Sequence, residues 1–442
     1  MKKSLPLLLS FLLAVTQGIP QALTNEHPSW IMQGNIYEVN IRQYTEEGTL
    51  NAFAKHLDRL KEMGVQTVWF MPINPISKVD RKGSLGSYYA VSDYTAINPE
   101  FGTLADFTRL VQSIHGKGMK VIIDWVPNHT GADNRWLVQH PDFFVKDRSG
   151  KAAVAQDWSD TRQLNYKNPV MQDSMIAAMK YWITHAHIDG FRCDVAWNVP
   201  ASFWRKCIPQ LKKMKSLFLL AEGDSAYLPV SGFDAVYPWH MFHMMEKIAK
   251  GERPAFGLDS VRKQSDALYP FGTIQLYFTS NHDENSWNQA DYGSFPGAIH
   301  APFAVFTQTM AGGVPLIYSG QEEPVLRPLK FFDRDPIHWA KFQRAAFYKT
   351  LLALRKRNSA LSADASFRKV PAGDDKAVYA YVREKGSARV LVILNLSNRE
   401  QSITIRDARL EGHPINVFAG KKEPVTGQPW SLKPWGYVVY EY

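Results

Sequence analysis

The chain has 442 residues, of which 45% are hydrophobic and 21% are charged. These fractions are ordinary for a globular protein, and they exclude a disordered chain, a fibrous repeat and a small disulfide-rich scaffold. The formal net charge is +9, but the basic residues are scattered in short groups such as Lys212-Lys213. Basic stretches with interleaved aromatic residues, which bind nucleic acids, are absent from the sequence, so we expect no nucleic-acid partner.

The first residues follow the three-part pattern of a secretory signal peptide. Lys2 and Lys3 precede an apolar run from Leu5 to Val15, and small and polar residues come next. The run is too short to cross a membrane as a permanent helix, and no later stretch reaches the ~18 apolar residues of a membrane span. We therefore expect a signal peptide over residues 1–22, a secreted or periplasmic protein and no membrane span.

Strands and helices alternate over the predicted catalytic domain, residues 30–358. The first strand covers residues 35–40, and Thr49 caps a helix that ends at Gly64. Residues 68–71 of the next strand are apolar without alternation, which is typical of a parallel strand buried on both faces. Later helices open at Thr103 and at Asn168-Pro169, and the last covers residues 342–357; later strands are expected at 121–124, 188–194, 217–222, 233–237, 273–278 and 314–319. About eight strands, most followed by a helix, predict an α/β fold built on a (β/α)8 TIM barrel.

Two segments depart from this alternation. Residues 130–166 are polar and irregular, which predicts a short insertion after the third strand, organised as a small subdomain. Residues 359–442 contain only short apolar runs separated by turns, which predicts a C-terminal all-β domain of the β-sandwich type. Its expected strands are 377–382, 388–394, 402–405 and 436–440.

Polar residues gather where the predicted barrel strands end, which is where the active site of such a barrel lies. They are Asp124, Asn128, His129, Arg192, Asp194, Glu222, Asn281, His282 and Asp283. Each of them alone has an ordinary structural explanation, such as a helix cap. Together they place four acids, an arginine and two histidines on one rim, which indicates an active site.

The fourth strand brings an arginine next to an acid. Side chains two residues apart point the same way, so Arg192 and Asp194 both face the barrel mouth while Cys193 faces the helices. The arginine should lower the pKa of Asp194, which suits a nucleophile. Glu222 ends an apolar run, and an apolar setting raises a carboxyl pKa and suits a general acid. Carboxyl groups on adjacent strand ends can lie about 5–5.5 Å apart, the spacing of glycoside hydrolysis with retention.

Four segments resemble the α-amylase family of glycoside hydrolases, known as glycoside hydrolase family 13. They are residues 124–129, 190–196, 221–223 and 280–285, and they occur in the order of that family. Residues 86–94, 164–166 and 313–322 resemble it as well, so the resemblance covers about residues 30 to 440. It implies a retaining hydrolase that cleaves α-glucosidic bonds of starch-like α-glucans or maltooligosaccharides by double displacement.

The resemblance assigns roles residue by residue. Asp194 matches the catalytic nucleophile, Glu222 the acid/base, and Asp283 the third acid, which holds sugar hydroxyls. The residues that match the substrate-binding set are Tyr89, Asp124, His129, Arg192 and His282. In that set the arginine orients the nucleophile, the tyrosine stacks under the sugar, and the histidines bind its hydroxyls. We expect ionised carboxylates beside a cationic transition state and neutral donors on the hydroxyls.

The sequence departs from the family after the nucleophile. Many starch-cleaving members carry Lys and His where this chain has Trp197 and Asn198, so endo-action on long α-1,4-glucans is in doubt. An α-glucan transglycosylase, an exo-acting α-glucosidase and a non-catalytic carbohydrate-binding relative therefore stay open as alternatives. The intact acids argue against the last of these.

Less specific sequence features bear on metal binding, on the pairing of the cysteines and on the oligomeric state. The chemistry needs no cofactor. Asn128 matches a calcium ligand of the family, but the short 130–166 segment does not offer the six to eight oxygens that calcium prefers, so a structural calcium stays open. A disulfide between Cys193 and Cys207 stays open as well. We expect a monomer whose partner is its α-glucan or oligosaccharide substrate.

Overall fold

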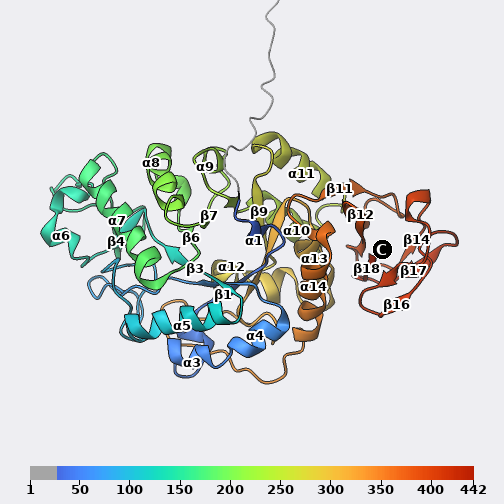
Figure 1. The fold of residues 1–442 in the computed structure, drawn as a ribbon, viewed down its shortest axis with the longest axis horizontal. Coiled ribbons are helices and arrows are strands. Elements are labelled where there is room, and N and C mark those ends of the chain that lie inside the picture. Colours follow the sequence, from blue (N-terminus) through green and yellow to red (C-terminus); the bar gives the residue numbers. More distant parts are fainter. Residues whose placement is uncertain (1–26) are drawn as a thin grey trace, which may run out of the picture.

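A computed structural model describes residues 27–442, and at its centre is a closed barrel of eight parallel strands (Figure 1). The predicted signal peptide lies outside the described residues. Around the barrel the strands follow one another in the order β1-β10-β9-β8-β7-β6-β3-β2. Their bounds are β1 Ile36–Val39, β2 Thr67–Phe70, β3 Lys120–Trp125, β6 Gly190–Cys193, β7 Phe218–Ala221, β8 Ala235–Val236, β9 Ile274–Tyr277 and β10 Gly313–Tyr318. The predicted fold class is confirmed.

Both faces of the barrel strands are buried, as the unbroken apolar runs predict. In β3, Val121 and Ile123 pack in the core beneath the helices, whereas Ile122 packs with Trp69 of β2 in a second core. Gly190 of β6 shows how tightly the strands approach, because a Cβ atom there would lie 1.9 Å from the carbonyl oxygen of Phe218. Side chains continue to point alternately toward the helices and into the barrel up to the strand ends. This alternation determines which polar side chains enter the barrel mouth.

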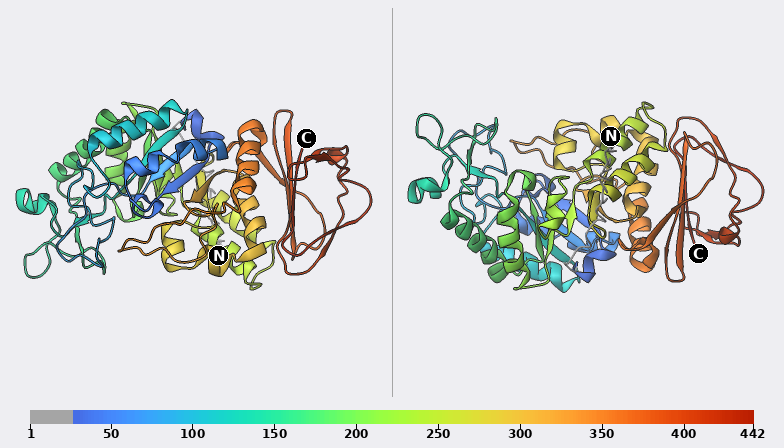
Figure 2. Two further views of the ribbon diagram at one scale, coloured as in Figure 1. Left: turned by 90° about the horizontal axis from the view of Figure 1, so that it is seen from below. Right: turned by 90° about the horizontal axis from the view of Figure 1, so that it is seen from above.

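The helices surround this barrel and form its outer layer (Figures 1 and 2). The longer ones are α5 Leu104–Gly116, α7 Pro169–Ala186, α8 Ala201–Lys212, α10 Trp239–Ala249, α11 Gly257–Leu268, α13 His300–Thr309 and α14 Ala345–Arg357. The short ones are α1 Ser29–Met32, α2 Ile41–Tyr44, α3 Leu50–Ala54, α4 Leu57–Met63, α6 Trp136–Gln139, α9 Tyr227–Val230 and α12 His282–Trp287.

One predicted helix is divided in two. The sequence predicts a single helix from Thr49 to Gly64, whereas the structure has α3 and α4 with a tight turn between them. The amides of Lys55 and His56 bond to carbonyls three residues back, which interrupts the α-helical pattern. Thr49 caps α3 through the amide of Ala52, and Gly64 ends α4 with a positive φ of 104°, as expected.

Three long connections rise above the carboxyl ends of the strands. One follows β2 and covers residues 71–103, another follows β3 and includes the predicted insertion, and the third covers residues 319–344 after β10. The insertion is held at its base by an antiparallel pair, β4 His129–Gly131 and β5 Thr161–Gln163, in which His129 lies opposite Gln163. These connections form the walls of the barrel mouth.

The C-terminal strands form a six-stranded sheet and a two-stranded sheet. Figure 2 shows them at one end of the barrel, with the insertion at the opposite end. In β12, Tyr379 and Tyr381 pack against Phe306 of α13, while Ala380 faces a separate core that includes Ile403. The strands are β11 Ser366–Lys369, β12 Val378–Lys385, β13 Ala388–Asn395, β14 Gln401–Ile403, β15 Ile415–Asn416, β16 Lys421–Lys422, β17 Trp430–Leu432 and β18 Tyr437–Glu441.

The fold also bears on the possible disulfide and on the expected absence of a membrane span. Cys193 and Cys207 are both buried and both free thiols in the structure, so they are not joined by a disulfide. Among residues 27–442, every helix is too short or too polar to cross a membrane.

Candidate active site

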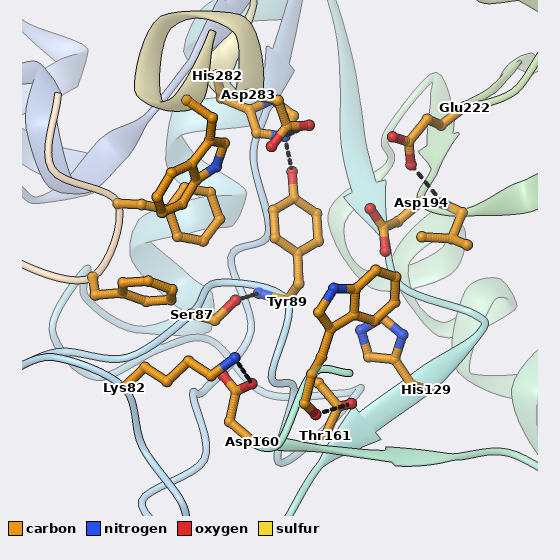
Figure 3. Close-up of a pocket in the computed structure, with 15 residues that line it drawn as sticks. Lys82, Ser87, Tyr89, His129, Asp160, Thr161, Asp194, Glu222, His282 and Asp283 are labelled. Carbon is orange, nitrogen blue, oxygen red and sulfur yellow. Dashed lines mark hydrogen bonds and ion pairs between the residues drawn. The ribbon is translucent and has the colours of Figure 1, made fainter. Parts of the chain in front are cut away.

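Four acids and one arginine reach the barrel mouth from neighbouring strands. Asp124 and Arg192 lie side by side in β3 and β6, Asp194 directly follows β6, and Glu222 directly follows β7. Asp283 lies in the first turn of α12, just after β9. For Asp124, Arg192, Asp194 and Glu222, the alternation of side chains along the strand directs the side chain into the barrel. The structure therefore brings the three sequence-predicted catalytic acids, Asp194, Glu222 and Asp283, into one pocket (Figure 3).

Arg192 connects the acids from below. Its Nη1 atom lies 2.9 Å from Asp124 Oδ1 and 3.0 Å from Asp194 Oδ1, and its Nη2 atom lies 3.2 Å from Glu222 Oε2. The guanidinium is fully buried and packs over the ring of Trp69. One fixed cation therefore sets the positions of three carboxylates at once.

The charge balance of this cluster differs from the sequence-based expectation. Burial and the neighbouring Glu222 carboxylate raise the pKa of Asp194 well above its ordinary value, although Arg192 lowers it as expected. Burial likewise raises the pKa of Asp124 to about 6 against the opposing effect of Arg192. A single arginine does not offset the loss of water around several acids, so the cluster favours keeping a proton among its carboxyl groups.

Glu222 is held by the backbone that follows the nucleophile. Val195 adopts a left-handed conformation with φ 44°, which a β-branched residue rarely does, and its amide donates a 2.6 Å hydrogen bond to Glu222 Oε2. This contact fixes the Glu222 carboxyl beside Asp194. Sequence reasoning missed Val195, because a valine in an apolar context gives no signal of positive φ.

His282 lies between two carboxylates. Its Nδ1 atom is 2.5 Å from Glu38 Oε1, and its Nε2 atom is 3.1 Å from Asp283 Oδ2. Burial lowers the pKa of His282, but the two carboxylates outweigh burial and raise it well above its ordinary value. Burial raises the pKa of Asp283, but His282 outweighs that effect and lowers it. The two carboxylates thus favour a protonated His282 ring, where we expected a neutral donor, and that ring in turn favours the ionised form of Asp283.

The second histidine behaves as expected. His129 is buried, and burial lowers its pKa to about 4, so its ring is neutral at ordinary pH.

Tyr89 completes this side of the site: its ring stacks on Phe331 with centroids 6.1 Å apart, and its hydroxyl donates to Asp124 Oδ2 at 3.2 Å. The predicted substrate-binding residues thus line or support the same pocket.

The pocket has a volume of about 260 Å³, slightly below the range of about 300–1,000 Å³ for small-molecule sites. Its rim comes from the three long connections and from α12. Side chains that sequence reasoning missed contribute much of the wall: Lys82, Trp158, Asp160, Trp287, Phe331 and Phe332. Aromatic faces beside hydrogen-bonding groups are suited to a ring with apolar faces and polar edges, such as a sugar.

Comparison with known proteins agrees with this geometry. The family model for the α-amylase catalytic domain matches residues 27–159, and the model for the maltogenic amylase C-terminal domain matches residues 367–439. The solved structure of a noncanonic maltogenic α-amylase, AmyB from Thermotoga neapolitana, superposes with a TM-score of 0.84 at 27% identity and covers 93% of this chain and 99% of that one. The chain belongs to the α-amylase family of glycoside hydrolases.

Other members of the α-amylase family are similar over most of the chain. An α-amylase from Lactobacillus plantarum superposes with a TM-score of 0.84 at 27% identity, covering 94% of this chain and all of that one. The α-amylase MalA of Haloarcula japonica is 26% identical over 87% of this chain, which spans 58% of that relative. Neopullulanase 2 of Thermoactinomyces vulgaris is 28% identical over 87% of this chain, which spans 68% of it.

The family's calcium position is filled by amide groups in this member. Asn128 is buried, and its Oδ1 atom accepts hydrogen bonds from Asn198 Nδ2 at 2.9 Å and Gln163 Nε2 at 3.3 Å. Gln163 Nε2 also donates to the Asn128 carbonyl at 2.9 Å. Within residues 27–442, no three His, Cys, Asp or Glu side chains are grouped as metal ligands. Because donors point at the oxygens that a cation would use, these residues do not fit calcium.

We therefore expect a chelator to leave the melting temperature, Tm, unchanged to within about 1 °C. An ion at 100 times its Kd adds about 2.7 kcal/mol to stability, and its removal would lower Tm by several degrees. Differential scanning calorimetry with EDTA and with excess CaCl₂ measures this directly. Asn198→Ala should lower Tm in both solutions equally, because it removes a hydrogen bond and no metal ligand. A Tm that falls in EDTA and recovers with calcium would contradict the expectation.

Proposed function

We propose that this chain is a retaining hydrolase that cleaves α-glucosidic bonds of α-glucans by double displacement. The observation that carries the proposal is the contact of Arg192 with both Asp194 and Glu222, at 3.0 and 3.2 Å, within one pocket. Two carboxyl groups held side by side by one guanidinium suit a nucleophile and an acid/base that act on the same anomeric carbon.

In the first step, a carboxylate oxygen of Asp194 attacks the anomeric carbon, and the bond from that carbon to the glycosidic oxygen breaks. Glu222 gives its proton to the departing oxygen, so the shortened chain leaves as an alcohol. The ring carries positive charge in the transition state, which the neighbouring carboxylates stabilise in a water-poor site. Asp283, kept ionised by His282, accepts hydrogen bonds from sugar hydroxyls.

In the second step, Glu222, now a carboxylate, takes a proton from water. The oxygen of that water attacks the anomeric carbon and displaces Asp194, which regains its negative charge. Two inversions at one carbon give net retention. The two roles of Glu222 require it to hold a proton before the first step and none before the second.

The names of relatives support the α-glucan substrate class. They include α-amylases, a cyclomaltodextrinase from Bacillus sp. and a neopullulanase. In this chain, the aromatic side chains of Trp158 and Phe331 and the neutral His129 offer stacking surfaces and hydrogen bonds for glucosyl rings. The N-terminal charge and hydrophobicity pattern supports export to the periplasm or the medium, where such polymers occur, and we propose that the enzyme acts as a monomer.

The anomeric configuration of the first product tests this proposal. Mature protein is mixed with maltoheptaose, and proton NMR follows the anomeric signals within the first minutes. We expect α-anomers to appear first and to equilibrate to the β-form by mutarotation. Initial β-anomers would contradict double displacement, and turnover without release of a reducing end would move the assignment to a transglycosylase. The matched control is Glu62→Gln, which changes an exposed carboxylate outside the pocket and should leave the profile unchanged.

A further inference from the structure

One end of the pocket lies opposite Glu222. Lys82 and Asp160 form this end, and Figure 3 shows Tyr89 and Asp194 between them and Glu222. Lys82 Nζ lies 3.2 Å from Asp160 Oδ1, and the Lys82 side chain keeps 35% of its surface exposed. An ion pair between Lys82 and Asp160 therefore lines this end of the pocket.

The carboxylate of this pair has an unused acceptor. Asp160 is 3% exposed, and in the described part of the chain its buried Oδ2 atom accepts no hydrogen bond. A buried carboxylate oxygen without a donor costs free energy, which a hydrogen bond from a ligand recovers. Because Asp160 lines the pocket, the hydroxyl group of a sugar is a suitable donor.

The pocket end formed by Lys82 and Asp160 is braced by three connections. Arg162 Nη2 lies 2.5 Å from Asp80 Oδ2, which ties the insertion to the connection after β2. Ser84 donates its amide to Asp333 Oδ1 at 2.8 Å, which ties that connection to the one after β10. Contacts on both sides of Lys82 thus fix the wall in place, so the pocket does not open by moving a single side chain.

The chemistry of the reaction orients a chain in this pocket. The leaving group departs past the general acid, so it lies on the Glu222 side. The glycone is attacked at its anomeric carbon by Asp194, and the rest of the glycone must extend away from Glu222. Its non-reducing end therefore approaches Lys82 and Asp160.

We propose that Lys82 and Asp160 bind the non-reducing-end hydroxyls of a short glycone and block longer ones, so that the enzyme removes units of one fixed short length from chain ends. This proposal rests on the proposed function of the same pocket. Lys82 donates to a hydroxyl oxygen, and Asp160 Oδ2 accepts from a hydroxyl hydrogen. The pocket volume of about 260 Å³ is small for a ligand site, which favours a short glycone.

The wild-type protein provides the first test. Maltoheptaose labelled at its reducing end is compared with the same oligosaccharide carrying a 4,6-O-ethylidene block at its non-reducing end, and chromatography resolves the products over time. We expect labelled products that shorten by one constant step, and blocked substrate cut at least about tenfold more slowly. Mixed lengths from the start and equal rates on both substrates would overturn the inference while the proposed function stands. Inactivity on every α-glucan would contradict the proposed function itself.

Opening the wall provides the second test. In the double variant Lys82→Ala and Asp160→Ala, we expect kcat/KM on unblocked substrate to fall roughly 10- to 100-fold, the usual effect of losing hydrogen bonds to charged groups. The blocked and unblocked rates should move toward each other, and mixed product lengths should appear. Lys349→Ala removes an exposed lysine from the Lys349–Glu62 pair and serves as the matched control. An unchanged ratio of the two rates in a variant with wild-type Tm would overturn the inference.

Discussion

Asp194→Asn is expected to lower kcat on maltooligosaccharides by a factor on the order of 10⁴ to 10⁶, the scale seen when a catalytic nucleophile is removed. The amide has nearly the same shape as the carboxylate and can still contact Arg192. It cannot form the covalent bond to the anomeric carbon, and it carries no negative charge to stabilise the transition state. Steady-state kinetics on maltoheptaose, with enzyme concentrations high enough to detect slow turnover, measure the loss.

The stability of the same variant separates catalysis from folding. The pKa of Asp194 is raised in the folded protein, so the stability associated with its protonated form is present below about pH 3.9 and is lost as pH rises through the folded pKa. Asparagine is neutral at every pH and avoids this loss. We therefore expect Asp194→Asn to melt above the wild type at pH 7 and close to it at low pH. Near-wild-type turnover, or a Tm far below the wild type at pH 7, would contradict these expectations.

Glu222→Gln is expected to lower kcat on maltooligosaccharides by about 10²- to 10⁴-fold, the usual contribution of general acid–base catalysis. A substrate that needs no proton for departure should escape much of the first-step loss. With α-maltosyl fluoride, we expect a rapid burst of fluoride followed by slow turnover, because Asp194 still attacks but no base activates water. Rapid-quench measurement of fluoride release resolves the two phases.

Azide provides a sharper control for the same substitution. It attacks the glycosyl-enzyme without giving up a proton, so it should restore turnover of Glu222→Gln and yield an α-glycosyl azide. Azide should not restore Asp194→Asn in this way, because that variant has no covalent intermediate to intercept. Unimpaired hydrolysis of maltoheptaose by Glu222→Gln would show that another group is the acid/base.

Much of the fold could be predicted from local sequence patterns. Apolar runs such as residues 68–71 identified strands buried on both faces, and Thr103 and Asn168 marked helix starts that the structure has. The short C-terminal strands β15 and β16, two residues each, have too few residues for a detectable period. The division of the first predicted helix into α3 and α4 likewise depends on backbone turns that the apolar spacing does not encode.

The site could be predicted where it depends on position along a strand. Arg192 and Asp194 lie two residues apart at the end of one strand, so their side chains point the same way. That spacing alone was enough to predict their contact. Glu38 and Asp160 were missed, because their partners His282 and Lys82 are 244 and 78 residues away in the chain. One sequence feature does indicate a role for Glu38, because it is an acidic residue inside an otherwise apolar strand. The raised pKa of Asp194 depends on how many acids the fold buries together, which no single segment determines.

Covalent trapping tests the proposed mechanism most directly. A 5-fluoro-α-glucosyl fluoride combines a good leaving group with a ring that forms positive charge reluctantly, so the glycosyl-enzyme should accumulate. Trypsin then releases residues 193–205, a peptide whose only side-chain carboxylate is Asp194. We predict that mass spectrometry finds the fluoroglucosyl group on this peptide and not on residues 216–247, which carry Glu222. A label on the Glu222 peptide, or hydrolysis of the reagent without any covalent intermediate, would contradict the assignment of Asp194 as nucleophile.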